Sequence, residues 1–182
     1  MVKDNSYIYI VEYIPVVCWF SLNTMILLIY DSLFGNTAII AKKIEDTIRS
    51  GGHEVESKRV GEVTADDLKK GGPLVIGAPT QAFNASKVML EFLDKIDSHS
   101  VKGRKVIAFD TRLDLKSIDS KFLRWLVSRG GYATAPITKK LGRKGAVIIG
   151  SEGFLVSDRE GPLVEGELER AGDWIKQQLS KL

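Results

Sequence analysis

"ILLIYDSLFGNT", residues 26–37, joins an apolar run to a short loop of small and polar residues. A continuous apolar run of this length is typical of a β-strand that is buried on both faces of a sheet. The residues that follow place Ala41, Ile44 and Ile48 on one face of a helix, which Gly51 and Gly52 end. The stretch therefore predicts a strand, a loop and a helix in immediate succession.

The same alternation continues to the end of the chain. The pattern predicts further strands at 53–60, 73–80, 104–111 and 145–150, and helices at 64–70, 86–96, 117–129, 135–144 and 165–182. Strands that alternate with helices indicate a parallel sheet with right-handed crossovers and helices on both faces. We therefore expect a three-layer, doubly wound α/β fold whose five parallel strands follow the order 2-1-3-4-5.

Length and composition exclude several classes of protein. The chain has 182 residues, of which 44% are hydrophobic and 27% charged, as expected for one globular domain. A net charge of +3 is too small to indicate nucleic-acid binding. The single cysteine, Cys18, excludes an internal disulfide and favours a reducing compartment, so we expect a cytoplasmic location. Only His53 and His99 could join it, which argues against a His/Cys metal site.

The first 24 residues do not fit the domain pattern. They are apolar, but Glu12 and Pro15 interrupt them, whereas a membrane span needs ~20 mostly apolar residues. A basic start and a cleavage site, as in a signal peptide, are also missing. We interpret residues 1–24 as an extension outside a domain of residues 25–182, with an anchor or an oligomerisation segment as the alternative. The sequence leaves the oligomeric state open.

The loop after the first strand has the composition of an anion site. In a sheet of the predicted order, ligands bind beyond the carboxyl ends of the strands, between the first and third strands. A helix N-terminus offers unpaired N–H groups to an anion, and Ser32, Asn36 and Thr37 add side-chain donors. The loop contains no Lys or Arg and matches neither a Walker A loop nor a dinucleotide fingerprint. We predict a cradle for a monophosphate, and a simple helix cap is the alternative.

Two further strand ends carry polar or aromatic residues. The segment 77–86 follows the third strand, and the segment 109–112 ends the fourth. Because the carboxyl ends of parallel strands meet at one edge of the sheet, we expect these segments to form the walls of one site. No catalytic acid, base or nucleophile stands out in them.

Several of these stretches resemble the flavodoxin family and flavodoxin-like FMN proteins. They are "YDSLFGNT" (30–37), "IGAPTQAF" (76–83) and "FDTRL" (109–113), and "EGFLVSDREGPLVEGELERAGDW" (152–174) is similar to the same group. The match is to the small single-domain proteins of archaea and actinobacteria, and it covers residues 25–182. It implies a flavodoxin-like fold and bound FMN.

The resemblance also implies roles for individual residues. Loop 32–37 wraps the FMN phosphate, loop 79–84 flanks one side of the isoalloxazine ring, and loop 109–112 flanks the other side and the pyrimidine edge. The cofactor-binding residues that it implies are Ser32, Leu33, Phe34, Gly35, Asn36, Thr37, Pro79, Thr80, Gln81, Ala82, Phe83, Asn84, Phe109, Asp110, Thr111 and Arg112. Phe83 and Phe109 are the candidates for the aromatic residues that stack on the ring. Leu33 and Phe34 depart from the family, which usually has hydroxyl residues there.

The function implied is electron transfer between redox partners by an FMN protein. The alternative is an FMN-dependent oxidoreductase of the NAD(P)H:quinone type that acts on small molecules. The absence of an evident catalytic group favours the carrier and leaves open whether the protein is an enzyme. A receiver domain of the same topology is excluded, because an acidic pair after strand one and an Asp at the end of strand three are missing.

Three groups of residues have two interpretations each. Arg112 either raises the potential of the second electron at the pyrimidine edge or forms an ion pair with Asp110 or Asp114. The helix at 117–129, with Trp125, is either an ordinary packing helix or a lid over the flavin. The basic residues at 139–144 form either a solvated helix face or a docking patch for an acidic redox partner such as a ferredoxin.

Overall fold

A computed structural model describes residues 25–114 and 131–182 of the chain. The strands are β1 (Ile26–Tyr30), β2 (Val55–Arg59), β3 (Leu74–Gln81), β4 (Asn84–Ala85), β5 (Lys105–Leu113) and β6 (Val147–Val156). The α-helices are α1 (Asn36–Ser50), α2 (Ala65–Lys69), α3 (Lys87–Lys95), α5 (Thr134–Arg143) and α6 (Glu167–Leu179), and 3-10 turns η1 and η2 cover Val60–Glu62 and Ser98–Ser100. The predictions for 1–24 and 117–129, the Trp125 lid included, lie outside the described residues.

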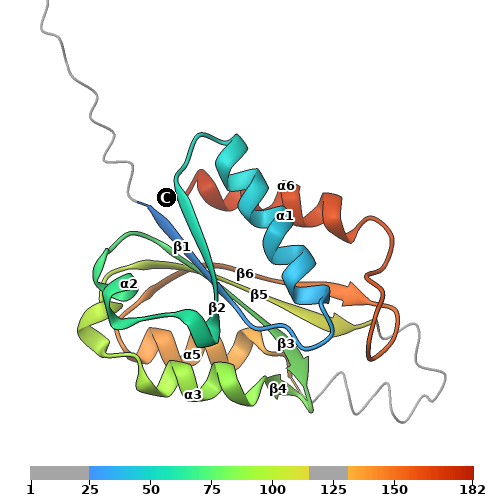
Figure 1. Cartoon of the computed structure of the whole chain (residues 1–182), viewed down its shortest axis with the longest axis horizontal. Helices are drawn as coiled ribbons and strands as arrows, with labels where there is room; N and C mark the ends of the chain where they lie inside the picture. The colour runs from blue at the N-terminus through green and yellow to red at the C-terminus, as the bar shows by residue number, and fades with distance from the viewer. Residues whose placement is uncertain (1–24, 115–130) are drawn as a thin grey trace, which may run out of the picture.

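The main strands form one parallel sheet in the order β2-β1-β3-β5-β6 (Figure 1). Counted along the chain without β4, this is the predicted order 2-1-3-4-5, and β2 lies at the edge of the sheet. Strand β4, which the sequence pattern did not predict, pairs antiparallel with the end of β3. The order reverses between β1 and β3, so the predicted switch point is confirmed.

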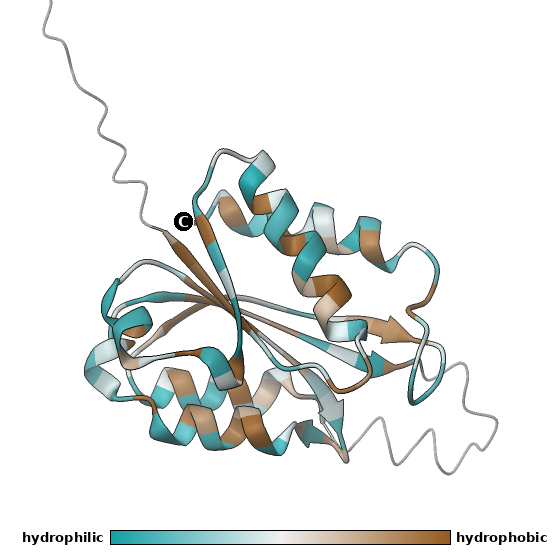
Figure 2. Ribbon diagram, viewed as in Figure 1, coloured by the Kyte–Doolittle hydropathy of each residue, from teal (hydrophilic) through white to brown (hydrophobic). Residues whose placement is uncertain are grey.

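Helices cover both faces of the sheet and give the predicted three layers. Helices α1 and α6 lie side by side on one face, and α3 and α5 lie on the other (Figure 1). The apolar residues of the strands gather at the centre of the molecule (Figure 2). The core under α1 and α6 contains Ile26, Leu28, Ile40, Ile44, Val75, Ile107, Phe109, Phe154 and Ile175, and the core on the other face contains Leu27, Ile29, Leu74, Ile76, Met89, Leu93, Val106, Ile137 and Leu141.

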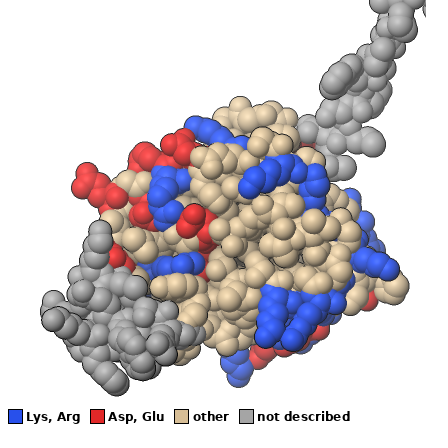
Figure 3. Space-filling model, turned by 180° about the vertical axis from the view of Figure 1, so that it is seen from behind, with Lys and Arg blue, Asp and Glu red and all other residues tan. Residues whose placement is uncertain are grey.

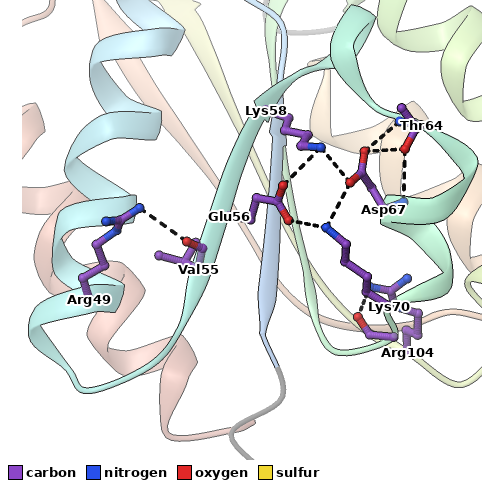
Figure 4. A network of polar contacts seen from close by, with 9 residues as sticks. Arg49, Val55, Glu56, Lys58, Thr64, Asp67, Lys70 and Arg104 are labelled. Atoms are coloured by element: carbon purple, nitrogen blue, oxygen red, sulfur yellow. Dashed lines mark hydrogen bonds and ion pairs between the residues drawn. The ribbon is translucent and has the colours of Figure 1, made fainter.

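Thr64 and Asp67 cap the start of α2. The hydroxyl of Thr64 accepts a hydrogen bond from the N–H of Asp67 (3.3 Å), and the carboxylate of Asp67 accepts one from the N–H of Thr64 (2.8 Å). This reciprocal pair satisfies two backbone donors at the helix start. The same carboxylate accepts hydrogen bonds from Lys58 of β2 (2.6 Å) and from Lys70 (3.2 Å) (Figure 4). Because Glu56 also contacts both lysines, a charged network attaches α2 to the edge strand (Figure 4).

Arg104 stabilises the amino-terminal end of the sheet, where β3 and β5 begin. Its guanidinium donates to the carbonyl oxygens of Leu68 (2.8 Å), Gly71 (2.7 Å) and Ser100 (3.1 Å), and also to Gly72. Partial burial lowers the pKa of this side chain. These bonds tie the turn after α2 to the residue that precedes β5, so they hold the start of β3 beside the start of β5.

The face shown in Figure 3 carries Lys and Arg in several separate groups, with Asp and Glu between some of them. Among the helices of residues 25–114 and 131–182, none is both long and apolar enough to span a bilayer.

Candidate functional site

A cavity of about 570 Å³ lies beyond the carboxyl ends of β1, β3, β5 and β6. Its lining consists of Leu33, Phe34, Asn36, Thr37, Pro79, Thr80, Gln81, Ala82, Thr111, Arg112, Leu113, Val156 and Arg159. This volume falls in the range of sites for small molecules and cofactors, ~300–1,000 Å³. The cavity thus occupies the predicted place, and it brings residues of all three predicted segments together.

The β1–α1 loop presents unpaired N–H groups at one end of the cavity. The N–H of Asp31 still pairs with the sheet, at the carbonyl of Gly77 (3.0 Å), and Gly35 with φ 93° then turns the chain into α1. Among the described residues, the backbone N–H groups of residues 33–37 have no acceptor. The N-terminus of a helix also carries a partial positive charge. Free donors and a helix dipole together make this end suitable for an anion.

Ser32 and Gly35 shape the loop without lining the cavity. The hydroxyl of Ser32 accepts the N–H of Ala38 (3.2 Å), which caps the first turn of α1. Its own proton is not used in that bond. This hydrogen bond does not exclude the anion site, because the N–H groups of residues 33–37 remain free.

Thr37 and Thr111 connect two predicted walls. Their hydroxyl oxygens lie 2.7 Å apart in a buried hydrogen bond between α1 and β5. Each hydroxyl has one proton, and the shared bond uses one of the two. The other proton is left to donate to a ligand, and both side chains line the cavity.

The segment after β3 is a hairpin and not an open loop, which corrects the sequence interpretation. β3 continues through Gln81, and a two-residue turn of Ala82 (φ 45°) and Phe83 (φ 65°) leads into β4. Positive φ at both central residues is the geometry of a type I′ turn, which favours Asn-Gly. The turn carries Phe83 and Asn84 away from the cavity lining, whereas Pro79 to Ala82 remain in it. The stacking role predicted for Phe83 does not fit this placement.

The segment 109–112 belongs to β5, which continues to Leu113. Phe109 is fully buried and packs edge-on against Phe154, with ring centroids 6.3 Å apart. Phe109 and Thr111 point to the same face, but residues two apart on a strand are separated by about 7 Å. Phe109 therefore lies deeper than Thr111, under α1 and α6. Its ring does not flank the cavity, contrary to the prediction. Core packing explains the aromatic residue here.

Arg112 forms the ion pair that the alternative interpretation predicted. Its guanidinium donates twice to the carboxylate of Asp110, at 2.6 and 2.7 Å, and it lies over the ring of Tyr132, 3.7 Å from the centroid. Asp110 is fully buried, and it also accepts the N–H of Thr134 at the start of α5 (3.1 Å). Asp110 is thus a structural residue outside the cavity lining, and it balances the charge of Arg112.

Three lining residues were missed by the sequence analysis, namely Leu113, Val156 and Arg159. Val156 and Arg159 belong to the end of β6 and the segment before α6. The stretch 152–174 had already shown similarity to the family, and this similarity was the available signal. Phe34, which was predicted to lie in the phosphate loop, lines the cavity and is 45% exposed. Among the described residues, it is the one aromatic side chain in the lining.

The basic residues 139–144 lie at the far end of the molecule. Lys140 forms an ion pair with Asp94, and Lys144 donates to the carbonyl of Ile96. The carbonyl of Gly145, which follows them, accepts the N–H of Gly103 just before β5 begins. These lysines therefore surround the amino ends of the strands, opposite the cavity. Within the part of the chain that is described, no group of three or more His, Cys, Asp and Glu could hold a metal ion.

The comparison of sequences finds partial matches to flavodoxins. A flavodoxin of Clostridium saccharobutylicum is 31% identical over 85 residues, which are 46% of this chain and 53% of that protein. A flavodoxin of Nitratidesulfovibrio vulgaris is 32% identical over 79 residues, 43% of this chain and 53% of that protein. The chain thus spans about half the length of the curated relatives it matches. No protein-family model matches the chain.

Solved structures match over most of the chain. An archaeal flavodoxin superposes with a TM-score of 0.66 at 20% identity, over 86% of this chain and 97% of the other. Oxidised flavodoxin 1 from Bacillus cereus superposes with a TM-score of 0.64 at 20% identity, over 87% of this chain and 99% of the other.

Strand order, helix layers and these superpositions define a flavodoxin-like α/β protein with a cavity at the switch point of its sheet. The chain is thus similar to flavodoxins in fold over most of its length and in sequence over somewhat less than half of it.

Proposed function

We propose that the chain binds FMN in this cavity and transfers electrons between redox partners. The observation that carries the proposal is the row of free N–H groups of residues 33–37 at the edge of a cavity of about 570 Å³. FMN joins a phosphate to a flat ring, and the site offers donors at one end and apolar side chains such as Leu33, Phe34 and Pro79 elsewhere. When bound, FMN would supply transfer of one or two electrons.

The residues present fit the phosphate with backbone donors. Leu33 and Phe34 have no side-chain donor, so their N–H groups contribute in place of hydroxyls. Thr37 and Thr111 contribute one hydroxyl proton between them, because their mutual bond uses the other. The amide of Asn36 already donates to the carbonyl of Glu160 (2.9 Å), so it contributes by positioning.

Arg112 and the exposed mouth set the environment of the ring. The guanidinium of Arg112 lines the cavity, but Asp110 balances its charge, so we expect a smaller effect on flavin potentials than an unpaired cation would have. Leu33 is 62% exposed and Phe34 45% exposed at the mouth. We propose that a redox protein covers this mouth, because electrons must pass where the ring is accessible. The basic residues 139–144 are too far from this mouth to form a docking patch for the partner there.

The names of the curated relatives support a carrier over an NAD(P)H:quinone-type enzyme. A cytoplasmic location, expected from the single cysteine, belongs to the same proposal.

The test is to purify the chain without added flavin, record its visible spectrum, and titrate the flavin-free protein with FMN while following flavin fluorescence. We expect a flavin spectrum or saturable quenching at one FMN per chain. A colourless protein that also fails to quench FMN would overturn the proposal. Stopped-flow mixing of the FMN-loaded protein with NADH or NADPH then separates the two functions, because a carrier is reduced slowly without its partner, whereas rapid reduction with turnover of a quinone indicates the enzyme.

A further inference from the structure

The segment between β6 and α6 returns to the start of α1, far away in sequence (Figure 1). The side-chain amide of Asn36 donates to the carbonyl of Glu160 (2.9 Å), across 124 positions of sequence. Gly161 lies so close to Asn36 that a Cβ at Gly161 would be 2.6 Å from its amide nitrogen. The segment is therefore held directly against the helix terminus that carries the free N–H groups.

Hydrogen bonds within the segment fix its tip. Both the N–H and the hydroxyl of Ser157 donate to the carbonyl of Pro162, at 2.9 and 3.0 Å, and the N–H of Gly161 donates to the carbonyl of Asp158 (3.0 Å). These bonds close a short turn around residues 158–161. Arg159 lies in this turn and lines the same cavity as Asn36.

Two arginines line the cavity, Arg112 and Arg159, and they differ in whether an acidic side chain neutralises the guanidinium. Arg112 is neutralised by Asp110, at 2.6 Å. Within residues 25–114 and 131–182, the guanidinium of Arg159 has no hydrogen-bond or ion-pair partner. The neighbouring Asp158 accepts the backbone N–H of Arg159, and Glu160 contributes its backbone carbonyl to Asn36. Neither acidic residue lines the cavity, so Arg159 adds positive charge to it.

We propose that Arg159 binds the phosphate of the cofactor together with the N–H groups of the β1–α1 loop and makes the site selective for the phosphorylated flavin. The inference rests on the proposed function. A phosphate monoester carries about −1.5 to −2 charges at neutral pH. The N–H groups of residues 33–37 and the helix dipole supply only partial charges, whereas a guanidinium supplies a full charge and two parallel donors. The cation that is missing from the β1–α1 loop thus comes from another segment.

The experiment compares Arg159→Gln with the wild type for FMN and for riboflavin, which has the same ring but no phosphate. Flavin-free protein is titrated with each, with fluorescence quenching as the readout. Arg143→Gln is the matched control, since it removes the same charge from an exposed residue at the far end of the molecule. For Arg159→Gln we expect the Kd for FMN to rise about tenfold at low ionic strength, and less at high salt because the pair is exposed to screening. The Kd for riboflavin should change less than about twofold, and Arg143→Gln should leave both unchanged.

Arg159→Lys gives a second measurement. It keeps the charge but loses the paired donors, so its Kd for FMN should lie between those of the wild type and Arg159→Gln. Wild-type affinity for FMN in Arg159→Gln would overturn the inference while leaving the proposed function intact. Equal losses for FMN and riboflavin would also overturn it, because the side chain would then act on the ring or on the fold. A wild-type chain that binds neither flavin overturns the proposed function and this inference together.

Discussion

Gly77 and Phe109 share one packing position between β3 and β5. They are partners in the register of the two strands, and a Cβ at Gly77 would lie 2.1 Å from Cζ of Phe109. The Phe109 ring thus fills the space that a side chain at position 77 would need. The contact lies directly before Ala78 and Pro79, so it also fixes the end of β3 that leads into the cavity.

Substitution of Gly77 by Ala should destabilise the fold. We expect the free energy of unfolding to fall by about 1–3 kcal/mol, because the added methyl forces Phe109 out of its preferred position. Denaturant unfolding of the wild type and Gly77→Ala measures this fall in the free energy of unfolding. Gly142→Ala is the control: its Cβ meets nothing within 4 Å in α5, and it should stabilise by up to about 1 kcal/mol. Phe109→Leu should offset part of the loss when combined with Gly77→Ala, and strict additivity of the two losses would contradict this account.

At the scale of the element, α2 depends on charges for its attachment to β2. This helix is only five residues long, which is too short to be stable alone. Thr64 and Asp67 cap it, and Lys58 and Lys70 join Asp67 to Glu56 of β2 (Figure 4). The hydrogen bond from Lys58 is the main cause that lowers the pKa of Asp67, and the bonds from the N–H and hydroxyl of Thr64 add to it.

This network predicts how stability depends on pH. The folded-state pKa of Asp67 is below its ordinary value of 3.8, so its contribution is fully present above about pH 4 and is lost as pH falls through the lower folded pKa. The stability difference between wild type and Asp67→Asn should therefore be constant from about pH 5 to 8 and shrink below about pH 4. Denaturant unfolding at a series of pH values measures it. Asp66→Asn, an exposed neighbour on the same helix, should show little difference at any pH, and a similar profile for both variants would count against the role of Asp67.

At the scale of the whole molecule, the cavity joins strand ends that the chain reaches at widely separated positions. Loop 33–37, the β3–β4 hairpin, the end of β5 and the segment after β6 each contribute to the lining. A ligand that contacts all four stabilises their mutual arrangement, because it binds the folded chain and not the unfolded one.

FMN should accordingly raise the stability of the entire domain. At a free FMN concentration of 100 times Kd, we expect the free energy of unfolding to increase by about 2.7 kcal/mol. Thermal and denaturant unfolding, with and without FMN, measure the increase. Riboflavin at the same concentration should give a smaller one, because it lacks the phosphate. An FMN-loaded protein that unfolds at the same midpoint as the flavin-free protein would contradict cofactor binding to the folded state.

The sequence by itself determined the order of elements, the parallel sheet and the place of the cavity. Short apolar runs, helical periodicity and Gly stops are local signals, and the crossover rule converts their order into topology. The caps at Thr64 and Ser86 were predictable for the same reason, since both bonds lie within three residues. Ten of the predicted site residues line the cavity, because strand ends in a parallel sheet meet at one edge.

The tertiary structure decided what depends on depth and on contacts between distant segments. Phe109 and Thr111 have the same direction along β5, and only the position of α1 and α6 makes one core and the other cavity wall. The hairpin at Ala82 and Phe83 lacks the residues that usually mark such a turn, so pairing with β3 decided it. Arg159 reaches the cavity because its segment packs on Asn36 across 124 positions, and no local pattern of the sequence encodes that contact.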